Sequence, residues 1–320
     1  MRKSFTKKAI WMNEMVRAFA PATVSNVACG FDTFGFAIDG PGDVVTAKKA
    51  ASGIIISKIS GDENRLPLDA KKNTAGIAVN KLLKIAKSNA GVELQIEKKM
   101  PFASGLGSSA ASAAAAVRAV NILLGLNRSE KELLSCVIES EKSISGTAHA
   151  DNAAPCLMGG FIIVRKIKPL DVVSVPVPEN LFYALVHPQV EVNTSQARQA
   201  MPIIIPLKTA IQHWSNTAAL VHAMHSADLQ LLARSMEDMI AEPVRKQWIP
   251  FYDEAKKEAL NSGAFASNIS GSGPSIFAFC DSADKAEKAA HKMKAVFDGQ
   301  NIGCSLFHGK IRQEGAIVVE

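Results

Sequence analysis

The sequence lacks the features that mark several large classes of protein. Only 6% of its 320 residues are aromatic, and its lysines and arginines are scattered along the chain. The net charge of +6 therefore does not predict a nucleic-acid partner, because such a partner calls for a basic stripe interleaved with stacking side chains. We expect the positive charge to serve a cleft for anionic nucleotides or simply a basic surface.

Cysteine is also scarce and unpaired. The cysteines are odd in number and form no CxxC pair, which argues against a disulfide framework and against a zinc site. Reduced thiols are typical of the cytoplasm, where we expect this chain to reside. The five positions are Cys29, Cys136, Cys156, Cys280 and Cys304.

Long apolar segments are missing as well. No run approaches the length of a membrane span, and the start of the chain has neither the apolar stretch nor the small-residue cleavage site of a secretory signal. We therefore expect no membrane partner. Residues 1–14 precede the first strand pattern, and we interpret them as dispensable, either a disordered extension or the result of an upstream start codon.

The remaining composition is that of an ordinary globular protein. Hydrophobic residues make up 48% of the chain and charged residues 21%, over a length that favours two domains. We place the boundary at Pro176 and Pro178, which predicts an amino-terminal domain over 1–178 and a carboxy-terminal domain over 179–320.

Hydrophobic periodicity predicts a mixed order of strands and helices, which indicates an α+β fold with sheets backed by helices. Gly91 and Gly125 are expected to end two helices, and Ser129 with Glu132 forms a capping box for a third. Strands are predicted at 16–20, 44–47, 53–59, 92–97, 159–165, 172–177, 181–187, 265–269, 275–280, 304–307 and 316–319, and helices at 74–90, 108–124, after Ser129, 209–240, 252–261 and 283–297.

A glycine-rich loop before the helix at 108–124 is the strongest functional signal. Its glycines allow close approach of the backbone to a ligand, and the amides of the following helix start attract phosphate oxygens. It lacks the GxxxxGK[ST] spacing, so no lysine of such a motif reaches the phosphates. A structural turn is the alternative interpretation. The loop comprises Pro101, Phe102, Ala103, Ser104, Gly105, Leu106, Gly107, Ser108, Ser109, Ala110, Ala111 and Ser112.

A bound Mg²⁺ would neutralise phosphate charge at this loop. It needs only one or two protein oxygens besides water and phosphate. Ser109 supplies one, and either Glu139 or Glu141 on the next helix supplies another, unless both carboxylates lie on a solvated face.

Three further segments combine polar groups with small residues. His149, Asp151 and Asn152 lie in AHADNAAP, where HxD has no third ligand at metal spacing and is more typical of hydrogen bonding to a substrate. Arg198 and Arg245 carry planar guanidinium groups that suit a carboxylate, although each could be a surface arginine. The tract SGSGPS at 270–275 is either a hairpin turn or a set of amides for an anion.

Four segments in order, APATVSNVACGFDTFG, PFASGLGSSAAS, SGTAHADNAAP and ISGSGPS, resemble the GHMP kinases. The first and third, with VNTSQAR and IAEPVR, are similar to the branch that phosphorylates L-homoserine in threonine biosynthesis. The resemblance implies a domain like ribosomal protein S5 domain 2 followed by a ferredoxin-like domain, with the site between them. It also implies ATP and Mg²⁺, and homodimers occur in the family, although no segment marks an interface.

Matching positions carry residue roles over to this chain. The resemblance assigns ATP phosphates to 101–112, adenosine contacts to Asn73, and Mg²⁺ to Ser109 and Glu141. Thr194 is implied near the transferred phosphate and Gly273 beside the substrate. L-Homoserine is implied to bind Asn26, Asp32, His149 and Asp151, with its carboxylate on Arg198 and Arg245.

Two positions depart from the family pattern. Where relatives such as mevalonate kinase place a catalytic aspartate, this chain has Asn152, so we hypothesise catalysis without a carboxylate base, supported by Asn152, Thr194 and Arg198. Ala28 and Cys29 replace a glycine-rich pair, which predicts a thiol near the substrate. The alternatives for the function are another GHMP kinase with a different acceptor and a ligand-binding regulator without turnover.

Overall fold

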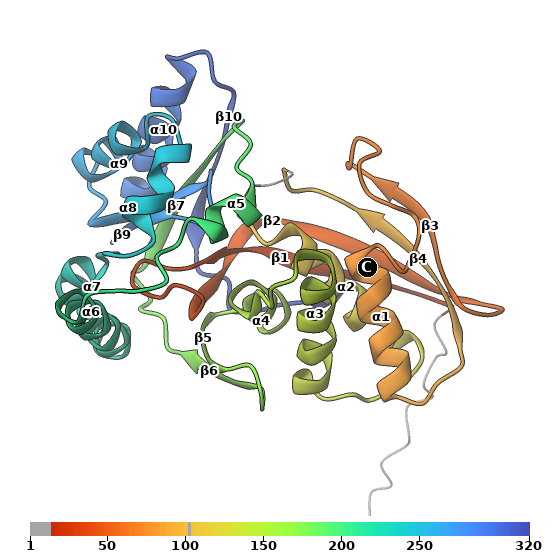
Figure 1. Ribbon diagram of the computed structural model, residues 1–320. Helices are drawn as coiled ribbons and strands as arrows, with labels where there is room; N and C mark the ends of the chain where they lie inside the picture. The colour runs from red at the N-terminus through yellow and green to blue at the C-terminus, as the bar shows by residue number, and fades with distance from the viewer. Residues whose placement is uncertain (1–13, 102–103) are drawn as a thin grey trace, which may run out of the picture.

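The computed structural model describes residues 14–101 and 104–320, and this part of the chain forms two β-sheets backed by helices (Figure 1). The larger sheet holds β1 (Met15–Ser25), β2 (Phe34–Ala50), β3 (Ile54–Ser60), β4 (Gly91–Glu97), β5 (Phe161–Lys166), β6 (Asp171–Val175) and β11 (Ile317–Val319). The smaller sheet holds β7 (Phe182–Pro188), β8 (Ala266–Ile269), β9 (Ile276–Cys280) and β10 (Cys304–Lys310).

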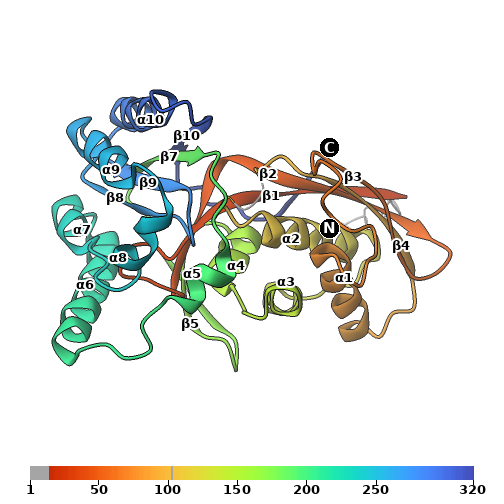
Figure 2. The same ribbon diagram turned by 45° about the horizontal axis from the view of Figure 1, so that its top comes forward.

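The helices cover one face of each sheet. The first group lies below the larger sheet in Figure 2 and comprises α1 (Thr74–Ile85), α2 (Ser108–Leu123), α3 (Glu130–Ser145) and α4 (Ala150–Met158). The second half of the chain contributes α5 (Thr194–Gln199), α6 (Leu207–Ser226), α7 (Leu229–Ser235), α8 (Glu242–Arg245), a 3₁₀ turn (Lys246–Trp248), α9 (Tyr252–Asn261) and α10 (Ala283–Asp298). Among the residues described, no helix is both long and apolar enough to cross a membrane.

The strands β8 and β9 of the smaller sheet, and nearly all of β7, are buried on both faces, and this packing joins the two halves of the molecule. Along β9, Phe277 and Phe279 point toward the core of the first half, whereas Ile276 and Ala278 pack in the cluster beneath α9 and α10. Alternate side chains of a strand face opposite sides of the sheet, so one strand serves both cores. The ring of Phe36 in β2 lies 5.7 Å from Phe277 and 5.3 Å from Phe279.

Helix α2 occupies the centre of the first half. Its alanines are completely buried, and their small side chains let the helix lie close to the strands β1 and β2. Gly125 follows with a φ of +58°, the left-handed conformation that ends many helices. The helix therefore places its amino-terminal end, and the glycine-rich loop before it, at the junction of the two halves.

Most elements lie where periodicity predicts them, and the α+β class is confirmed. The predicted helix at 74–90 is too long: it ends at Ile85, and Gly91 begins β4 instead of capping the helix. A Cβ on Gly91 would lie 2.5 Å from the oxygen of Ala50, so strand pairing with β2 requires this glycine. The helices predicted over 209–240 are α6 and α7, which are separated at Ala227 and Asp228, and the second of them ends earlier than predicted, at Ser235.

Helix α4 was not predicted, because its sequence contains Pro155. It packs against β2 so closely that a Cβ on Gly35 would lie 1.8 Å from the backbone oxygen of Asp151. This close approach fixes the depth at which Asp151 and Asn152 lie.

The last strand returns to the first half of the molecule. β11 pairs antiparallel with β1, with Arg17 opposite Val319 and Phe19 opposite Ile317. The division of the chain at residue 178 stays a prediction, and the topology adds that residues 317–319 complete the sheet begun by residues 15–25.

Candidate active site

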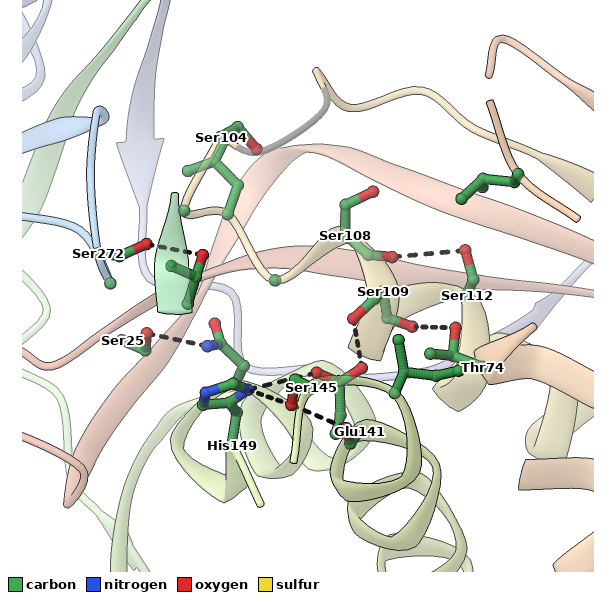
Figure 3. Close-up of a pocket in the computed structure, with 18 of the residues that line it drawn as sticks. Ser25, Thr74, Ser104, Ser108, Ser109, Ser112, Glu141, Ser145, His149 and Ser272 are labelled. Atoms are coloured by element: carbon green, nitrogen blue, oxygen red, sulfur yellow. Dashed lines mark hydrogen bonds and ion pairs between the residues drawn. The ribbon is translucent and has the colours of Figure 1, made fainter. Parts of the chain in front are cut away.

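A cavity of about 410 Å³ lies where the two halves meet. Its walls come from the glycine-rich loop, the starts of α1 and α2, the ends of α3 and α8, the helices α4 and α5, and the β8–β9 loop. Figure 3 shows side chains from these elements pointing toward one space. Predicted residues that line it are Asn26, Asp32, Asn73, Ser104, Gly105, Leu106, Gly107, Ser108, Ser109, Ser112, Glu141, His149, Asn152, Thr194, Arg198 and Arg245.

The glycine-rich loop requires glycine at two positions. Gly105 and Gly107 have φ values of +70° and +68°. A Cβ on Gly105 would lie 2.5 Å from the oxygen of Ser270, and one on Gly107 would lie 2.2 Å from the Thr23 hydroxyl. Gly107 also stands at the N-cap of α2 without a side-chain cap, so the first amides of the helix remain available for an anion.

The second half of the chain clamps this loop through two serines of the SGSGPS hairpin. The hydroxyl of Ser270 donates to the backbone oxygen of Gly105 at 2.7 Å, and that of Ser275 donates to the oxygen of Ser104 at 2.5 Å. His187 Nδ1 lies 3.2 Å from the Ser275 hydroxyl, and burial lowers the pKa of this imidazole to about 4. The hairpin therefore both lines the cavity and supports the loop.

A buried ion pair secures the other end of the loop. Lys98, with its side chain 3% exposed, pairs with the fully buried Asp43. The Lys98 ammonium also donates to the oxygen of Ser108 at 2.8 Å and to the Ser112 hydroxyl at 2.7 Å. Since each charge has a partner and further hydrogen bonds, the pair holds the first turn of α2 in place, and losing either partner would cost about 3–5 kcal/mol.

Ser109 and Glu141 lie side by side at the start of α2, as predicted for a metal pair. The Ser109 hydroxyl donates to the Glu141 carboxylate (Figure 3). Glu141 is buried, whereas the alternative, Glu139, is exposed. His149 Nδ1 lies 3.7 Å from the same carboxylate, and this contact raises the pKa of the imidazole. A carboxylate and a hydroxyl beside a phosphate-binding helix start are oxygen donors that fit Mg²⁺.

The opposite wall presents acidic and basic groups together. Asp32 pairs with Arg198 at 2.5 Å, and its backbone amide donates to Asn26 at 2.8 Å. The backbone amide of Asn26 in turn donates to Asp151 Oδ2 at 3.2 Å. Arg245 donates to the oxygen of Gly271 at 2.6 Å. These contacts connect Asn26, Asp32, Asp151 and Arg198. Five of the six residues predicted to bind the acceptor line the cavity, and the sixth, Asp151, lies behind its wall.

Asp151 is a buried carboxyl whose ionisation is opposed by its surroundings. Burial, followed by the nearby charge of Asp32, raises the pKa of Asp151 to about 6. Its neighbour Asn152 is held on both sides: the Thr23 hydroxyl donates to its Oδ1 at 2.8 Å, and its Nδ2 donates to Ser25 at 2.9 Å. The Asn152 amide is therefore fixed directly beside Gly107.

Some predicted residues lie elsewhere. Asn73 lines the cavity, but its side chain caps α1 by accepting from Ala75 and also donates to Pro67. Ala110 and Ala111 are completely buried in α2, and Pro101 and Gly273 do not line the cavity, whose hairpin wall is Gly271 and Ser272. Phe102 and Ala103 lie outside the described residues.

The prediction that the Cys29 thiol lies near the substrate is wrong. The thiol is buried and contacts the backbone oxygen of Ser235, at the end of α7, at 3.4 Å. Burial raises its pKa to about 11. Asn26 and Asp32 of the same loop line the cavity, whereas Cys29 turns into the core.

Sequence reasoning missed several side chains that position the site. Lys98 stands three residues before the loop, and a lysine at that position is a signal that could have been noted. The other side chains are recognised only from the fold, since their partners are distant in sequence. They are Thr23, Ser25, Asp43, Lys98, His187, Ser270 and Ser275.

Asp151→Asn is expected to raise the midpoint of thermal unfolding at pH 7.5. The folded state holds the Asp151 proton more tightly than the unfolded chain, so the favourable contribution is present below about pH 4 and lost as the pH rises through about 6. Removing the charge should recover up to about 3 kcal/mol at neutral pH. Calorimetry at pH 7.5 and pH 4 checks this; a variant that is less stable at pH 7.5, or equally stabilised at both pH values, would contradict it.

Comparison with known proteins agrees with the resemblance to the GHMP kinases. Residues 73–160 match the GHMP kinases N terminal domain, and residues 220–299 match the GHMP kinases C terminal domain. The homoserine kinase of Chlorobium phaeobacteroides (strain DSM 266) is 44% identical over 317 residues, which cover 95% of this chain and 99% of that protein. The homoserine kinase of Chlorobium phaeovibrioides is 45% identical over the same shares.

Solved structures agree. A crystal structure of homoserine kinase from Cytophaga hutchinsonii has a TM-score of 0.95 and 46% identity, and covers 99% of this chain and 100% of that one. Mevalonate kinase from L. major, with a TM-score of 0.70 over 92% of this chain and 95% of that one, is only 16% identical and shows the fold alone. The chain belongs to the homoserine kinases, a branch of the GHMP kinase family.

Proposed function

We propose that this chain transfers the γ-phosphate of ATP to the side-chain hydroxyl of L-homoserine, giving ADP and O-phospho-L-homoserine for threonine biosynthesis in the cytoplasm. The observation that carries the proposal is one cavity with a phosphate-binding loop on one wall and paired acidic and basic side chains on the other. The family assignment supports the same reaction.

The loop wall suits the triphosphate. The uncapped amides at the start of α2 provide the attraction for phosphate oxygens that a loop lysine gives elsewhere. Lys98 does not replace that lysine, because its ammonium is already engaged by Asp43 and Ser112. Ser109 and Glu141 would hold Mg²⁺, which neutralises phosphate charge when bound. Asn73 and Thr74 at the start of α1 line the part of the cavity that we assign to adenosine.

The opposite wall suits an amino acid. Among the residues that line the cavity, Asp32 matches an ammonium group, and Arg198 and Arg245 match a carboxylate, which leaves the hydroxyl to point toward the loop. The Asp151 carboxylate adds negative charge from behind the wall, where it accepts from the backbone amide of Asn26. Asn26 orients Asp32 through its backbone amide, and His149 adds a hydrogen-bonding group beside Glu141. An acceptor without an ammonium would leave a buried acidic group unmatched, which costs about 1–3 kcal/mol.

Phosphoryl transfer here proceeds by alignment and charge neutralisation, without a carboxylate base. Asn152 cannot take a proton, and both ends of its amide are occupied by Thr23 and Ser25. Thr194, whose hydroxyl lies 3.2 Å from that of Ser272, is placed to hydrogen-bond the transferred phosphate, and Arg198 adds positive charge. The hydroxyl proton leaves late, to phosphate or water, as a loose transition state permits.

The acceptor is tested by measuring ADP release with L-homoserine, mevalonate, shikimate and galactose, each with and without Mg²⁺. We expect turnover with L-homoserine alone, because only this acceptor matches the acidic and the basic groups together, and we expect that turnover to require Mg²⁺. Turnover of another acceptor without turnover of L-homoserine would overturn the proposed function.

The absence of a base is tested with Asn152→Ala and Asp151→Ala. We expect Asp151→Ala to raise KM for L-homoserine more than it lowers kcat, because we assign this carboxylate to binding. A different result would identify Asp151 as the base: kcat abolished in Asp151→Ala with L-homoserine affinity retained, beside a mild effect in Asn152→Ala.

We further propose that the enzyme is a homodimer built around the start of α6. Ile203 is 99% exposed and Ile204 is 86% exposed, and the α6 residues Leu207, Ile211 and Trp214 continue the apolar surface at helical spacing. Such a cluster is rare on a monomer. Between residues 201 and 214 Lys208 is the one Lys, Arg, Asp or Glu, so two copies could meet there with little repulsion.

Light scattering tests the dimer at micromolar concentration. Replacing Ile204 and Trp214 together with glutamate should give monomers, because the buried charges would repel across the interface. Ile122→Glu, at an isolated exposed apolar residue on α2, should leave the dimer intact. Monomeric wild-type protein would refute the proposal.

A further inference from the structure

The aromatic ring of Phe31 lies against both arginines of the acceptor wall. The guanidinium carbon of Arg198 lies 5.2 Å from the centre of the ring, and that of Arg245 lies 4.8 Å from it. Both distances are within the range of cation–π attraction. Phe31 belongs to the first half of the chain, whereas Arg198 lies in the last turn of α5 and Arg245 ends α8, so one ring contacts two cations from the second half.

The two arginines need such a partner. Because they share one ring, their charges are at most about 10 Å apart, and each repels the other. Arg198 is held by Asp32. Arg245 is 4% exposed, its Nε has no hydrogen-bond partner among the described residues, and no carboxylate bonds it. The face of an aromatic ring attracts a buried cation without competing for its hydrogen-bond donors.

The backbone around Phe31 is unusually constrained. Asn26, Ala28 and Asp32 all have φ values between +49° and +56°, a conformation that non-glycine residues rarely adopt. The loop is closed by the bond from the Asp32 amide to Asn26 and by bonds from Thr33 and Phe34 to the oxygen of Gly30. Strain of this kind persists where the surrounding structure imposes it, and it is concentrated at functional sites.

We propose that Phe31 is a positioning residue that sets the preference of this enzyme for acceptors with a carboxylate, by holding Arg198 and Arg245 at the spacing that grips both oxygens. The inference rests on the proposed function, since it concerns the carboxylate of the same acceptor. Phe31 does not line the cavity, so it acts through the arginines and does not touch the substrate.

The test compares Phe31→Leu, which keeps apolar bulk but loses the ring, with Phe31→Tyr, which keeps the ring. KM is measured for L-homoserine and ATP, and 3-aminopropan-1-ol, which is homoserine without its carboxylate, is measured as substrate or competitive inhibitor. Phe31→Leu should raise KM for L-homoserine about fivefold to tenfold, with kcat, KM for ATP and the affinity for 3-aminopropan-1-ol within about twofold. Phe31→Tyr should restore wild-type values.

Phe19→Leu is the matched control, because Phe19 makes the same kind of contact with Arg312, at 5.3 Å, outside the cavity. Unfolding midpoints show whether Phe31→Leu is folded, and Phe31→Met serves in its place if it is not. Equal losses for both acceptors, or no loss, would overturn the inference while leaving the proposed function intact. Wild-type enzyme that favours 3-aminopropan-1-ol over L-homoserine would overturn both.

Discussion

The open shape of the glycine-rich loop is the constraint on which the rest of the site depends. Backbone amides bind phosphate only if they converge, and a loop rich in glycine has little rigidity of its own to keep that shape. Here the first half of the molecule holds one end of the loop through Lys98 and Asp43, and the second half holds the other through Ser270 and Ser275. Phosphate binding is therefore a property of the junction.

Buried charge is used in two different ways around this loop. Lys98 and Asp43 neutralise one another, and both also hydrogen-bond the Ser112 hydroxyl. Asp151 and Arg245, in contrast, are buried with incomplete partners. Burial raises the pKa of Asp151 and lowers the pKa of Arg245, so it favours the neutral form of each. The folded protein bears a cost for these two groups, which a ligand of complementary charge would relieve. If these residues bind the acceptor as proposed, stability and acceptor recognition are opposed at the same positions.

The parts of the site that could be predicted from sequence are those built by neighbouring residues. The glycine-rich loop leads into its helix, and the capping box of Ser129 and Glu132 places α3, so either Glu139 or Glu141 could be expected near Ser109. The choice of Glu141 rested on the family resemblance, since spacing left Glu139 open. Helix α4 could not be predicted because Pro155 disfavours a helix locally. Tight packing on Gly35 outweighs that preference in the folded protein.

Contacts between distant segments could not be read from the sequence. Ser275 lies 171 residues from Ser104, and Lys98 lies 55 residues from Asp43. A serine in a turn or a lysine after a strand has many possible partners, and only the packing of the two sheets selects one. The direction of Cys29 illustrates the same limit, because Asn26 and Asp32 of the same strained loop line the cavity whereas Cys29, between them, turns into the core.

The return of β11 has a consequence for how the protein is made. Because β11 covers the outer edge of β1, the backbone groups along that edge lack their partner until a strand about 300 residues later has left the ribosome. An uncovered strand edge is a template for pairing with other chains. The first half of the nascent chain is therefore exposed to misassociation until residues 317–319 have emerged and paired with β1.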